Sequence, residues 1–247
     1  MYFTERHEDI IKLLKERNGA SVHFLAEQLH VSEPTIRRDL SFLEKEQRIK
    51  RTFGGAILND MSTSEIPLSL RENENRLPKE IIAKKAIDHI SDGKIIFIDA
   101  SSTASKLIKY LPNFSNLTII TNSPKNSLKL AELKIKSFST GGLLLENSIA
   151  YVGKGAEDFV RNFNADLFFF SCRGLSENGI LSDASIEESD LRRVMMEHSR
   201  KKIFLCTSDK IGKSYMYNLC KLSDVDEVIS DIPLSENLKQ LHAPAKP

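Results

Sequence analysis

The sequence of 247 residues contains few of the features that mark secreted or membrane proteins. Its only cysteines, Cys172, Cys206 and Cys220, form no Cys-x-x-Cys pair, which argues against a disulfide framework and a zinc site. No apolar run approaches the ~20 residues of a membrane-spanning helix; the strongly apolar stretch 166–171 has the length of a buried strand. The first residues lack the apolar segment of a signal peptide. We therefore expect a cytoplasmic protein with no membrane partner.

An excess of charge of one sign is also missing. The 35 Lys and Arg residues face 34 Asp and Glu residues, so any nucleic-acid site must be a local patch. Glycine and proline number 11 and 8, too few for a collagen-like or wholly disordered chain, and a hydrophobic fraction of 40% leaves enough material for a core. The length fits one large domain or two ordinary ones.

The first 58 residues carry the pattern of a small helical domain with a hairpin. Apolar residues recur at helical spacing through 10–14, 24–29 and 36–43. Ser21 and Ser32 precede the second and third helices and are typical N-cap residues. Residues 48–55 alternate like a strand and end in a Gly-Gly turn signal. This arrangement predicts a helix-turn-helix followed by a wing.

The stretch 31–40, VSEPTIRRDL, has the residue types that the second helix of a helix-turn-helix needs. Short side chains at its start let the helix approach a major groove, where Ser32 and Thr35 can donate to phosphates. Arg37 and Arg38 can reach phosphate oxygens or the edge of guanine. The sequence therefore predicts that double-stranded DNA is a partner.

The predicted hairpin adds Lys50 and Arg51 to the DNA-binding residues. The alternative is a surface helix whose arginines pair with Asp39 and Glu44, and charge alone does not decide, since residues 1–60 hold ten basic and ten acidic side chains. The spacing, the cap and the basic wing taken together favour DNA binding.

A polar segment, 59–78, is predicted to be a linker, and an α/β domain follows over 79–247. A helix is expected over 79–90. Apolar runs that predict strands each lead into a polar or glycine-containing loop, at 94–98, 117–120, 135–139, 167–170, 203–206 and 228–229. Repeated strand–loop–helix units predict a largely parallel sheet.

Several of these loops carry groups that suit a ligand, and ligands bind at the carboxyl ends of the strands in such sheets. The loop Asp99–Thr103 offers hydroxyls and backbone N–H groups to a phosphate, and Asp99 can accept from a sugar hydroxyl. Arg173 and Lys210 can neutralise an anion. Each loop also has a purely structural interpretation: Ser101 to Thr103 can simply cap a helix, and Gly141-Gly142 can simply form a turn.

Residues 22–56 resemble the winged helix-turn-helix of the DeoR family of bacterial transcriptional regulators. The match rests on Thr35-Ile-Arg-Arg-Asp-Leu40, Leu43-Glu44, Arg51 and Gly54-Gly-Ala56. It continues through most of the chain, at Thr121-Asn-Ser123, Gly141-Gly142, Glu188 and Lys210. Departures from the family pattern fall at Ser101, Ser171 and Thr207 in the second domain and at Gln47 and Phe53 in the first.

The resemblance implies that the second domain is a sensor with a fold like that of sugar-phosphate isomerases and an inducer that is a phosphorylated sugar. Carried over by position, the resemblance gives a set of residues that line the pocket: Asp99, Ser102, Thr103, Thr121, Asn122, Gly141, Gly142, Glu188 and Lys210. We expect a repressor of a carbohydrate or nucleoside utilisation operon. One wing domain covers too few base pairs for specificity, so we also expect a homo-oligomer, a dimer or a tetramer.

Two other functions fit parts of the sequence. An aldose–ketose phosphate isomerase needs a base and a cation, which Glu188 and Lys210 could supply. However, the Lys-Gly-Gly-Gly loop of ribose-5-phosphate isomerases has no counterpart; residues 183–188 stand there instead. The other is a DNA-binding protein whose second domain only oligomerises. We expect no enzyme and therefore no catalytic residues, and we expect neither a cofactor nor a metal.

Overall fold

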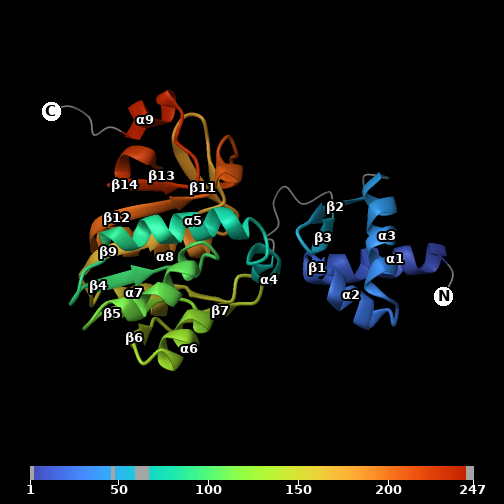
Figure 1. Ribbon diagram of the computed structural model, residues 1–247, viewed down its shortest axis with the longest axis horizontal. Helices are drawn as coiled ribbons and strands as arrows, with labels where there is room; N and C mark the ends of the chain where they lie inside the picture. Colours follow the sequence, from blue (N-terminus) through green and yellow to red (C-terminus); the bar gives the residue numbers. More distant parts are fainter. Residues whose placement is uncertain (1–2, 46–47, 59–66, 243–247) are drawn as a thin grey trace. The chain divides into compact units, whose positions relative to one another are not determined.

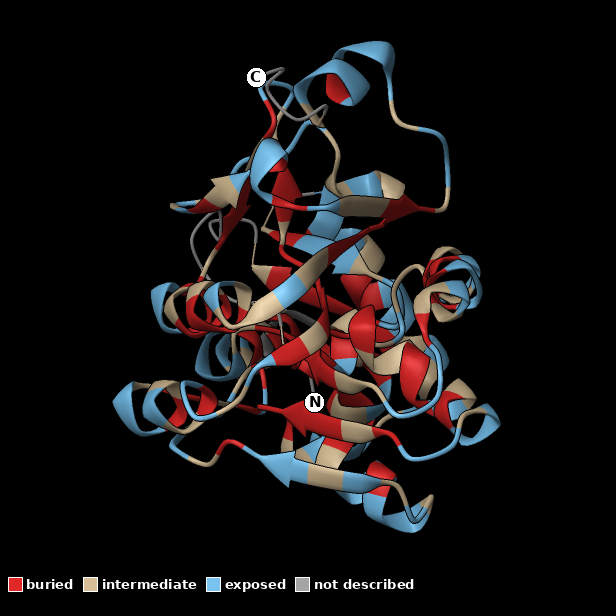
Figure 2. Ribbon diagram, turned by 90° about the vertical axis from the view of Figure 1, so that its left-hand side faces the viewer, coloured by how far each residue is buried: buried red, intermediate tan, exposed pale blue. Residues whose placement is uncertain are grey.

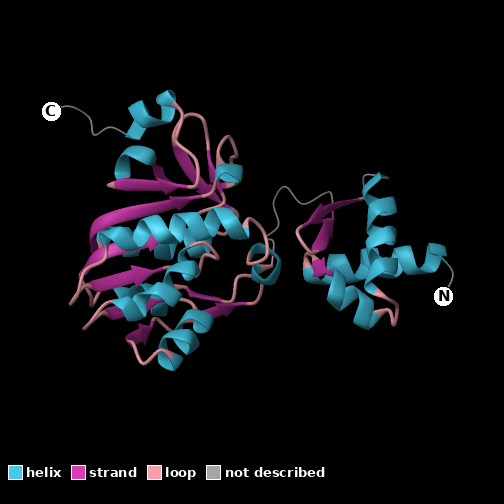
Figure 3. Ribbon diagram, viewed as in Figure 1, coloured by secondary structure: helices cyan, strands magenta, loops and turns pink. Residues whose placement is uncertain are grey.

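The computed structural model describes residues 3–45, 48–58 and 67–242, and the chain divides into two compact units, Met1–Arg76 and Leu77–Pro247. In the described part of the chain, no helix has the length and apolar character needed to cross a membrane. Figure 3 shows that the first unit is mainly helical with a small sheet, whereas the second alternates strands and helices.

The first unit contains the expected helices and hairpin (Figure 1). Its elements are α1 (Phe3–Arg17), β1 (Ala20–Ser21), α2 (Val22–Gln28), α3 (Glu33–Lys45), β2 (Ile49–Thr52), β3 (Gly55–Leu58) and α4 (Leu68–Arg71). Apolar side chains from α1, α2, α3 and the sheet meet in one buried core, including Leu14, Leu25, Ile36, Leu40 and Ile49. The helical periodicity of the sequence therefore identified the faces that pack together.

The two predicted N-caps differ. Ser21 caps α2, because its hydroxyl accepts from the backbone N–H of Phe24 at 3.1 Å. Ser32 also precedes its helix, but its hydroxyl lies 2.9 Å from the Thr35 hydroxyl. The Thr35 N–H donates to the backbone carbonyl of Ser32 at 3.0 Å. The acceptor at the start of α3 is therefore this carbonyl and not the Ser32 hydroxyl that the sequence predicted.

The hairpin lies where the sequence predicts it, with its turn one residue earlier than expected. Strand β2 pairs antiparallel with β3, and the turn falls at Phe53–Gly54, so Gly55 belongs to a strand. A Cβ on Gly55 would collide with the Ala20 carbonyl of the neighbouring strand β1 and would lie 2.8 Å from Leu70 Cδ2. Only glycine fits between β1 and the helix that covers it.

The predicted linker, 59–78, contains a packed helix. Residues 59–66 lie outside the described residues, as do 46–47 with Gln47. Helix α4 carries two buried leucines, Leu68 and Leu70, which are 3% and 1% exposed, and Leu70 lies over Gly19 and Gly55 of the first unit. The chain between α4 and α5 (Arg76–Ala86) is a short turned segment, 72–75, in which Asn75 is left-handed with φ 50°.

In the second unit a six-stranded, wholly parallel sheet has the order β14-β12-β9-β4-β5-β6, which Figure 1 shows from top to bottom. Its strands are β4 (Ile95–Ile98), β5 (Thr118–Thr121), β6 (Lys136–Ser139), β9 (Ala165–Phe170), β12 (Ser199–Cys206) and β14 (Glu227–Ser230). The six predicted strands and the α/β class with a winged helix-turn-helix before it are confirmed.

Buried layers lie on both faces of this sheet, as Figure 2 shows in red. Side chains alternate across a strand, so Phe168 and Phe170 of β9 pack on one face and Leu167 and Phe169 on the other. The first face is covered by α7 (Lys154–Val160) and α8 (Ile186–Glu197), the second by α5, η2 (Ala104–Asn113) and α6 (Pro124–Glu132). Burial on both faces explains why these strands are continuous apolar runs.

The sequence did not predict the shorter strands, nor that two of the predicted helices contain 3₁₀ segments. The remaining elements are η1 (Ile87–His89), β7 (Leu143–Leu145), β8 (Ala150–Val152), β10 (Gly174–Leu175), β11 (Ile180–Asp183), η3 (Ser208–Lys210), β13 (Tyr217–Lys221), η4 (Leu222–Asp224) and α9 (Glu236–His242). The helix expected over 79–90 is α5 followed by the 3₁₀ turn η1, and the helix after Thr103 is of the 3₁₀ type. The missed strands lie outside the six-stranded sheet, so burial on both faces does not mark them as continuous apolar runs.

Leu70→Ala tests whether α4 is part of the first unit. Removing a fully buried leucine side chain that packs over Gly19 and Gly55 should lower the free energy of unfolding of this unit by about 2–5 kcal/mol. Denaturant unfolding of the full chain measures it, with Leu77→Ala as the control, since Leu77 is 77% exposed. Equal stability of the two variants would show that α4 does not support the unit.

Candidate DNA-binding surface and sensor site

Helix α3 turns one face to the core and presents the other to solvent. Ile36, Leu40 and Leu43 are fully buried, whereas Arg37 and Arg38 are exposed. The turn from α2 to α3 is sharp because His30 adopts a left-handed conformation, with φ 52°. The arginines are therefore free to meet a partner without disturbing the core.

Asp39 has a structural role next to these arginines. It is 1% exposed and accepts from Arg6 Nε at 2.6 Å and from Arg6 Nη2 at 3.0 Å, while His7 Nε2 lies 3.3 Å away. These contacts bind α1 to α3. The alternative in which Asp39 and Glu44 neutralise the arginines of α3 is wrong, because Glu44 accepts from the backbone N–H of Arg51 at 3.0 Å.

The wing meets α3 at the same exposed face. Arg51 Nη1 donates to the Ser41 hydroxyl at 2.9 Å, and Ser41 donates to the Arg37 carbonyl at 2.8 Å. Arg37 itself pairs with Glu33 at 3.1 Å, an exposed contact of little strength. Neither Arg38 nor Lys50 has a hydrogen-bond or ion-pair partner in the described part of the chain. Arg37 and Arg38 thus lie near the start of α3 with Thr35, and Arg51 of the wing lies against Ser41, farther along the helix.

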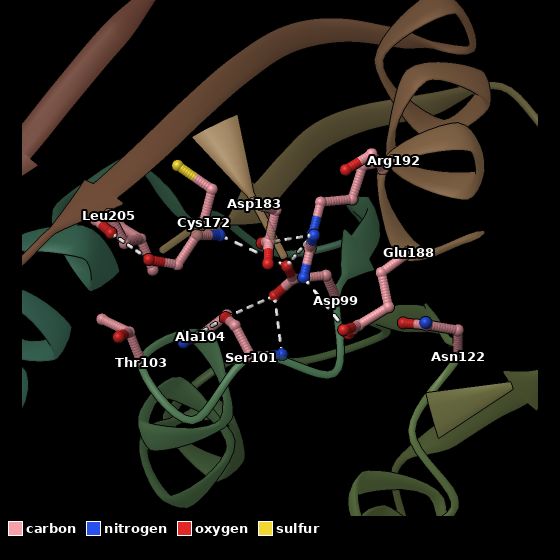
Figure 4. Close-up of polar contacts among 12 residues, drawn as sticks. Asp99, Ser101, Thr103, Ala104, Asn122, Cys172, Asp183, Glu188, Arg192 and Leu205 are labelled. Atoms are coloured by element: carbon pink, nitrogen blue, oxygen red, sulfur yellow. Dashed lines mark hydrogen bonds and ion pairs between the residues drawn. The ribbon is translucent and has the colours of Figure 1, made fainter. Parts of the chain in front are cut away.

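In the second unit, the carboxyl ends of β4, β9 and β12 lie side by side, because these strands are neighbours in the sheet. Asp99 follows β4, Ser171 follows β9 and Thr207 follows β12. All three are almost fully buried, with exposures of about 1%. Figure 4 shows the polar network around Asp99, Ser101 and Arg192.

Both oxygens of the Asp99 carboxylate are occupied. Oδ1 accepts from the Ser101 hydroxyl at 2.5 Å and from the Ser101 N–H at 3.1 Å. Oδ2 accepts from Arg192 Nε at 2.9 Å and from the Ser171 N–H at 3.3 Å. The expectation that Asp99 accepts from a sugar hydroxyl does not fit this arrangement, because four donors already satisfy the carboxylate. It fixes the loop that follows β4.

Arg192 is the centre of the network (Figure 4). Besides Asp99, its guanidinium donates to Asp183 Oδ2 at 2.9 Å and to Glu188 Oε1 at 3.3 Å. Burial lowers the pKa of Arg192, but the attraction of Asp183, Glu188 and Asp99 outweighs it and raises the pKa above its ordinary value. One buried charge therefore holds three carboxylates from β4, β11 and α8 together.

Lys210 enters the same site from η3. Its ammonium donates to the Ser171 hydroxyl at 2.5 Å and lies 3.4 Å from the Thr103 hydroxyl. Ser171 in turn donates to the Leu205 carbonyl at 2.5 Å, which anchors the lysine to the end of β12. Lys210 contacts hydroxyls and, within the described residues, no carboxylate. Its positive charge is thus not neutralised by an acid.

The turn that begins η2 holds unused donors next to Lys210. The backbone N–H groups of Ser102 and Thr103 have no acceptor in the part of the chain that the structure describes, although these residues are 6% and 1% exposed. The next N–H, of Ala104, donates to the Ser101 hydroxyl at 3.2 Å. Buried N–H groups are nearly always hydrogen-bonded in proteins, so two open ones at one turn indicate a place for an acceptor.

The remaining predicted residues lie around this network. Asn122, after β5, donates to the Tyr151 carbonyl at 3.1 Å, and its Oδ1 is buried without a partner among the described residues. Thr121 accepts from the Ser123 N–H at 3.2 Å and so supports the loop. Figure 4 shows Asn122 on the Glu188 side of the site. Arg173 Nε lies 4.0 Å from Asp183 Oδ1.

The predicted glycines lie farther along the edge, in the turn between β6 and β7. Gly142 has φ 107°, and a Cβ there would lie 2.5 Å from the Val152 carbonyl, so this position requires glycine for packing. Gly141, with φ 63°, has open space where a Cβ would be. Gly142 is thus closely packed against β8, whereas Gly141 faces open space.

Comparison with known protein families decides the identity of both units. The model of the DeoR-like helix-turn-helix domain matches residues 6–62, and that of the DeoR C terminal sensor domain matches residues 74–232. The chain belongs to the DeoR family of transcriptional regulators. The resemblance inferred from the sequence motifs is confirmed.

Individual relatives agree with this family assignment. The uncharacterized HTH-type transcriptional regulator YulB of Bacillus subtilis is 36% identical over 94% of this chain and 90% of its own length. The glycerol-3-phosphate regulon repressor of Escherichia coli is 32% identical over 96% of this chain and 94% of its own. Ribose 5-phosphate isomerase A of Methanocaldococcus jannaschii matches with a TM-score of 0.43 and 16% identity, over 56% of this chain and 55% of its own, too low to argue from.

Sequence reasoning about this DeoR-family sensor missed its central residue. The next residue of the helix, Arg193, lies half-exposed and donates to the Leu219 carbonyl at 3.2 Å. Its neighbour Arg192 is the one that points inward. The signal that could have found it is the spacing of Glu188 and Arg192, four residues apart on one helix, which places them on the same face.

Arg192→Met tests the importance of the buried guanidinium. The substitution leaves three buried carboxylates without their cation, so the free energy of unfolding should fall by about 3–5 kcal/mol. Thermal and denaturant unfolding measure the change. Arg200→Met is the matched control, because the Arg200 side chain is 82% exposed. Two variants of equal stability would contradict the central position of Arg192.

Proposed function

We propose that this DeoR-family protein is a repressor of an operon for carbohydrate or nucleoside utilisation, and that a phosphorylated sugar releases it from its operator. The observation that carries the proposal is the group of open donors at the start of η2. Two backbone N–H groups, of Ser102 and Thr103, adjoin the ammonium of Lys210. A helix start with free N–H groups and a lysine is suited to a phosphate. The printed name of the Escherichia coli relative, a glycerol-3-phosphate regulon repressor, supports a phosphorylated effector.

We assign two roles to the residues of the proposed effector site. Ser102, Thr103 and Lys210 contact the phosphate. Asp99 and Arg192 position the loops and do not touch it, because their hydrogen bonds are made within the protein. The sugar lies along the same edge of the sheet, next to Thr121, Asn122, Gly141, Gly142, Arg173 and Glu188.

The operator is read by the first unit. We propose that the start of α3 enters the major groove, with Ser32 and Thr35 on phosphates and Arg37 and Arg38 on bases or phosphates. Lys50 and Arg51 of the wing contact the backbone. The DNA-binding domain is 1–58, the linker 59–78 and the sensor 79–247. The protein acts in the cytoplasm as a homo-oligomer, a dimer or a tetramer, that reads repeated half-sites.

The network also argues against turnover of the sugar. An isomerase needs a base that can take a proton from carbon, and Glu188 is the acid that the sequence offers for it. Glu188 is 2% exposed, and its bond to the Arg192 guanidinium holds its carboxylate in place. We therefore propose a sensor that binds its ligand without converting it.

The double variant Arg37→Ala/Arg38→Ala tests the DNA-binding surface. Each lost base contact costs about 1–3 kcal/mol, so affinity for a duplex from upstream of the protein's own gene should fall at least roughly tenfold. Fluorescence anisotropy measures the affinity. Lys15→Ala, on the exposed side of α1, serves as the control. If the double variant and Lys15→Ala bind alike with unchanged melting temperatures, the surface is wrongly assigned.

Lys210→Ala tests the effector site separately. The variant should bind the duplex normally, because Lys210 lies in the sensor, but the phosphosugar concentration that releases half of the DNA should rise at least roughly tenfold. Lys213→Ala is the control, since the Lys213 side chain is 50% exposed. A normal response of Lys210→Ala would move the site elsewhere. No response of the unmodified protein to any phosphosugar would favour the reading in which the second domain only oligomerises.

A further inference from the structure

The Ser101 hydroxyl occupies a place that a ligand oxygen could take. It donates to Asp99 Oδ1 at 2.5 Å and accepts from the Ala104 N–H at 3.2 Å, and the residue is 6% exposed. Figure 4 shows it at the mouth of the η2 turn, between the carboxylate and Ala104. Its oxygen therefore has the two partners that an effector hydroxyl would need, and the Ala104 N–H alone would suit a phosphate oxygen.

The turn has three successive N–H groups at its start, and they are used unequally. Those of Ser102 and Thr103 have no acceptor among the described residues, whereas that of Ala104 is bound to Ser101. The Lys210 ammonium reaches the Thr103 hydroxyl, so the charged group adjoins the open part of the turn. The Ser101 hydroxyl thus accepts from one of three neighbouring N–H groups and makes that group unavailable to a ligand.

We propose that Ser101 determines the affinity and selectivity of the effector site, by closing the Ala104 N–H and one acceptor position of Asp99 to the ligand. This inference rests on the proposed function. The site that remains binds an anion through two N–H groups and Lys210, and the part of the effector next to Asp99 is left without a hydrogen bond to this carboxylate. A phosphate therefore binds more weakly than the turn itself would allow.

Two substitutions separate the hydroxyl from the rest of the side chain. Ser101→Ala removes the oxygen and retains Cβ, so the backbone keeps its conformational preferences. Ser101→Gly removes both and opens the most space. Ser105→Ala is the matched control, because Ser105 belongs to the same helix and its hydroxyl donates to the Ser101 carbonyl at 2.9 Å. Melting curves establish that each variant is folded.

Calorimetry with inorganic phosphate and with glycerol 3-phosphate, on the full chain, measures the effect. An added hydrogen bond to an anion changes affinity by roughly tenfold, so Ser101→Gly should bind at least one probe about tenfold tighter than the unmodified protein. Ser101→Ala should lie between the two, and Ser105→Ala should equal the unmodified protein. Affinities of both Ser101 variants that match the unmodified protein, or an equal gain in Ser105→Ala, would overturn the inference.

The outcomes also distinguish this inference from the proposed function. If Ser101→Gly binds a probe more tightly but no phosphosugar releases the unmodified protein from DNA, the role of Ser101 is supported and the proposed effector class is contradicted. Release of DNA from the unmodified protein by a phosphosugar, with no gain in Ser101→Gly, supports the effector class and contradicts the role of Ser101. Absence of phosphate binding in every variant contradicts both.

Discussion

The buried guanidinium of Arg192 is the constraint on which the sensor site depends. The loops after β4, β11 and at the start of α8 each bring a carboxylate into the interior, and without a cation between them their mutual repulsion and desolvation would drive them apart. Because Asp99 is held on one side by Arg192, its other oxygen can fix the turn that precedes η2. The geometry of this turn is thus set by Arg192, a residue outside it.

In both units a buried ion pair lies next to a cationic side chain that has no acidic partner in the part of the chain that the structure describes. In the first unit, Asp39 is buried and binds Arg6 and His7, which leaves Arg38 without a partner among the described residues. In the second, the carboxylates bind Arg192, which leaves the Lys210 ammonium among hydroxyls. In each case an internal ion pair stabilises the framework, and the cation next to it stays available. This division supports two functions in one chain, one for DNA and one for a small anion.

The sequence predicted the framework better than the site. Strands such as β9 were found because burial on both faces makes them continuous apolar runs, and α3 because its apolar face recurs at helical spacing. Arg192 was missed because one arginine on a mixed helix resembles its neighbour, and only its spacing of four residues from Glu188 distinguishes it before the fold shows which one points inward. The departures Ser101, Ser171 and Thr207 are scattered in sequence, yet they follow three adjacent strands and so lie at one edge of the sheet. The placement of α4 depends on contacts of Leu70 that no local pattern encodes.

The central claim is that one ligand-binding event in the sensor changes the affinity for DNA, and this coupling must be reciprocal. The direct measurement is calorimetric titration of the tightest-binding phosphosugar into the free protein and into its complex with the upstream duplex. The account predicts weaker sugar binding in the complex, by the same factor by which the sugar weakens DNA binding, about 5–150-fold for typical coupling energies. Equal affinity of the phosphosugar for the free and the DNA-bound protein would contradict it.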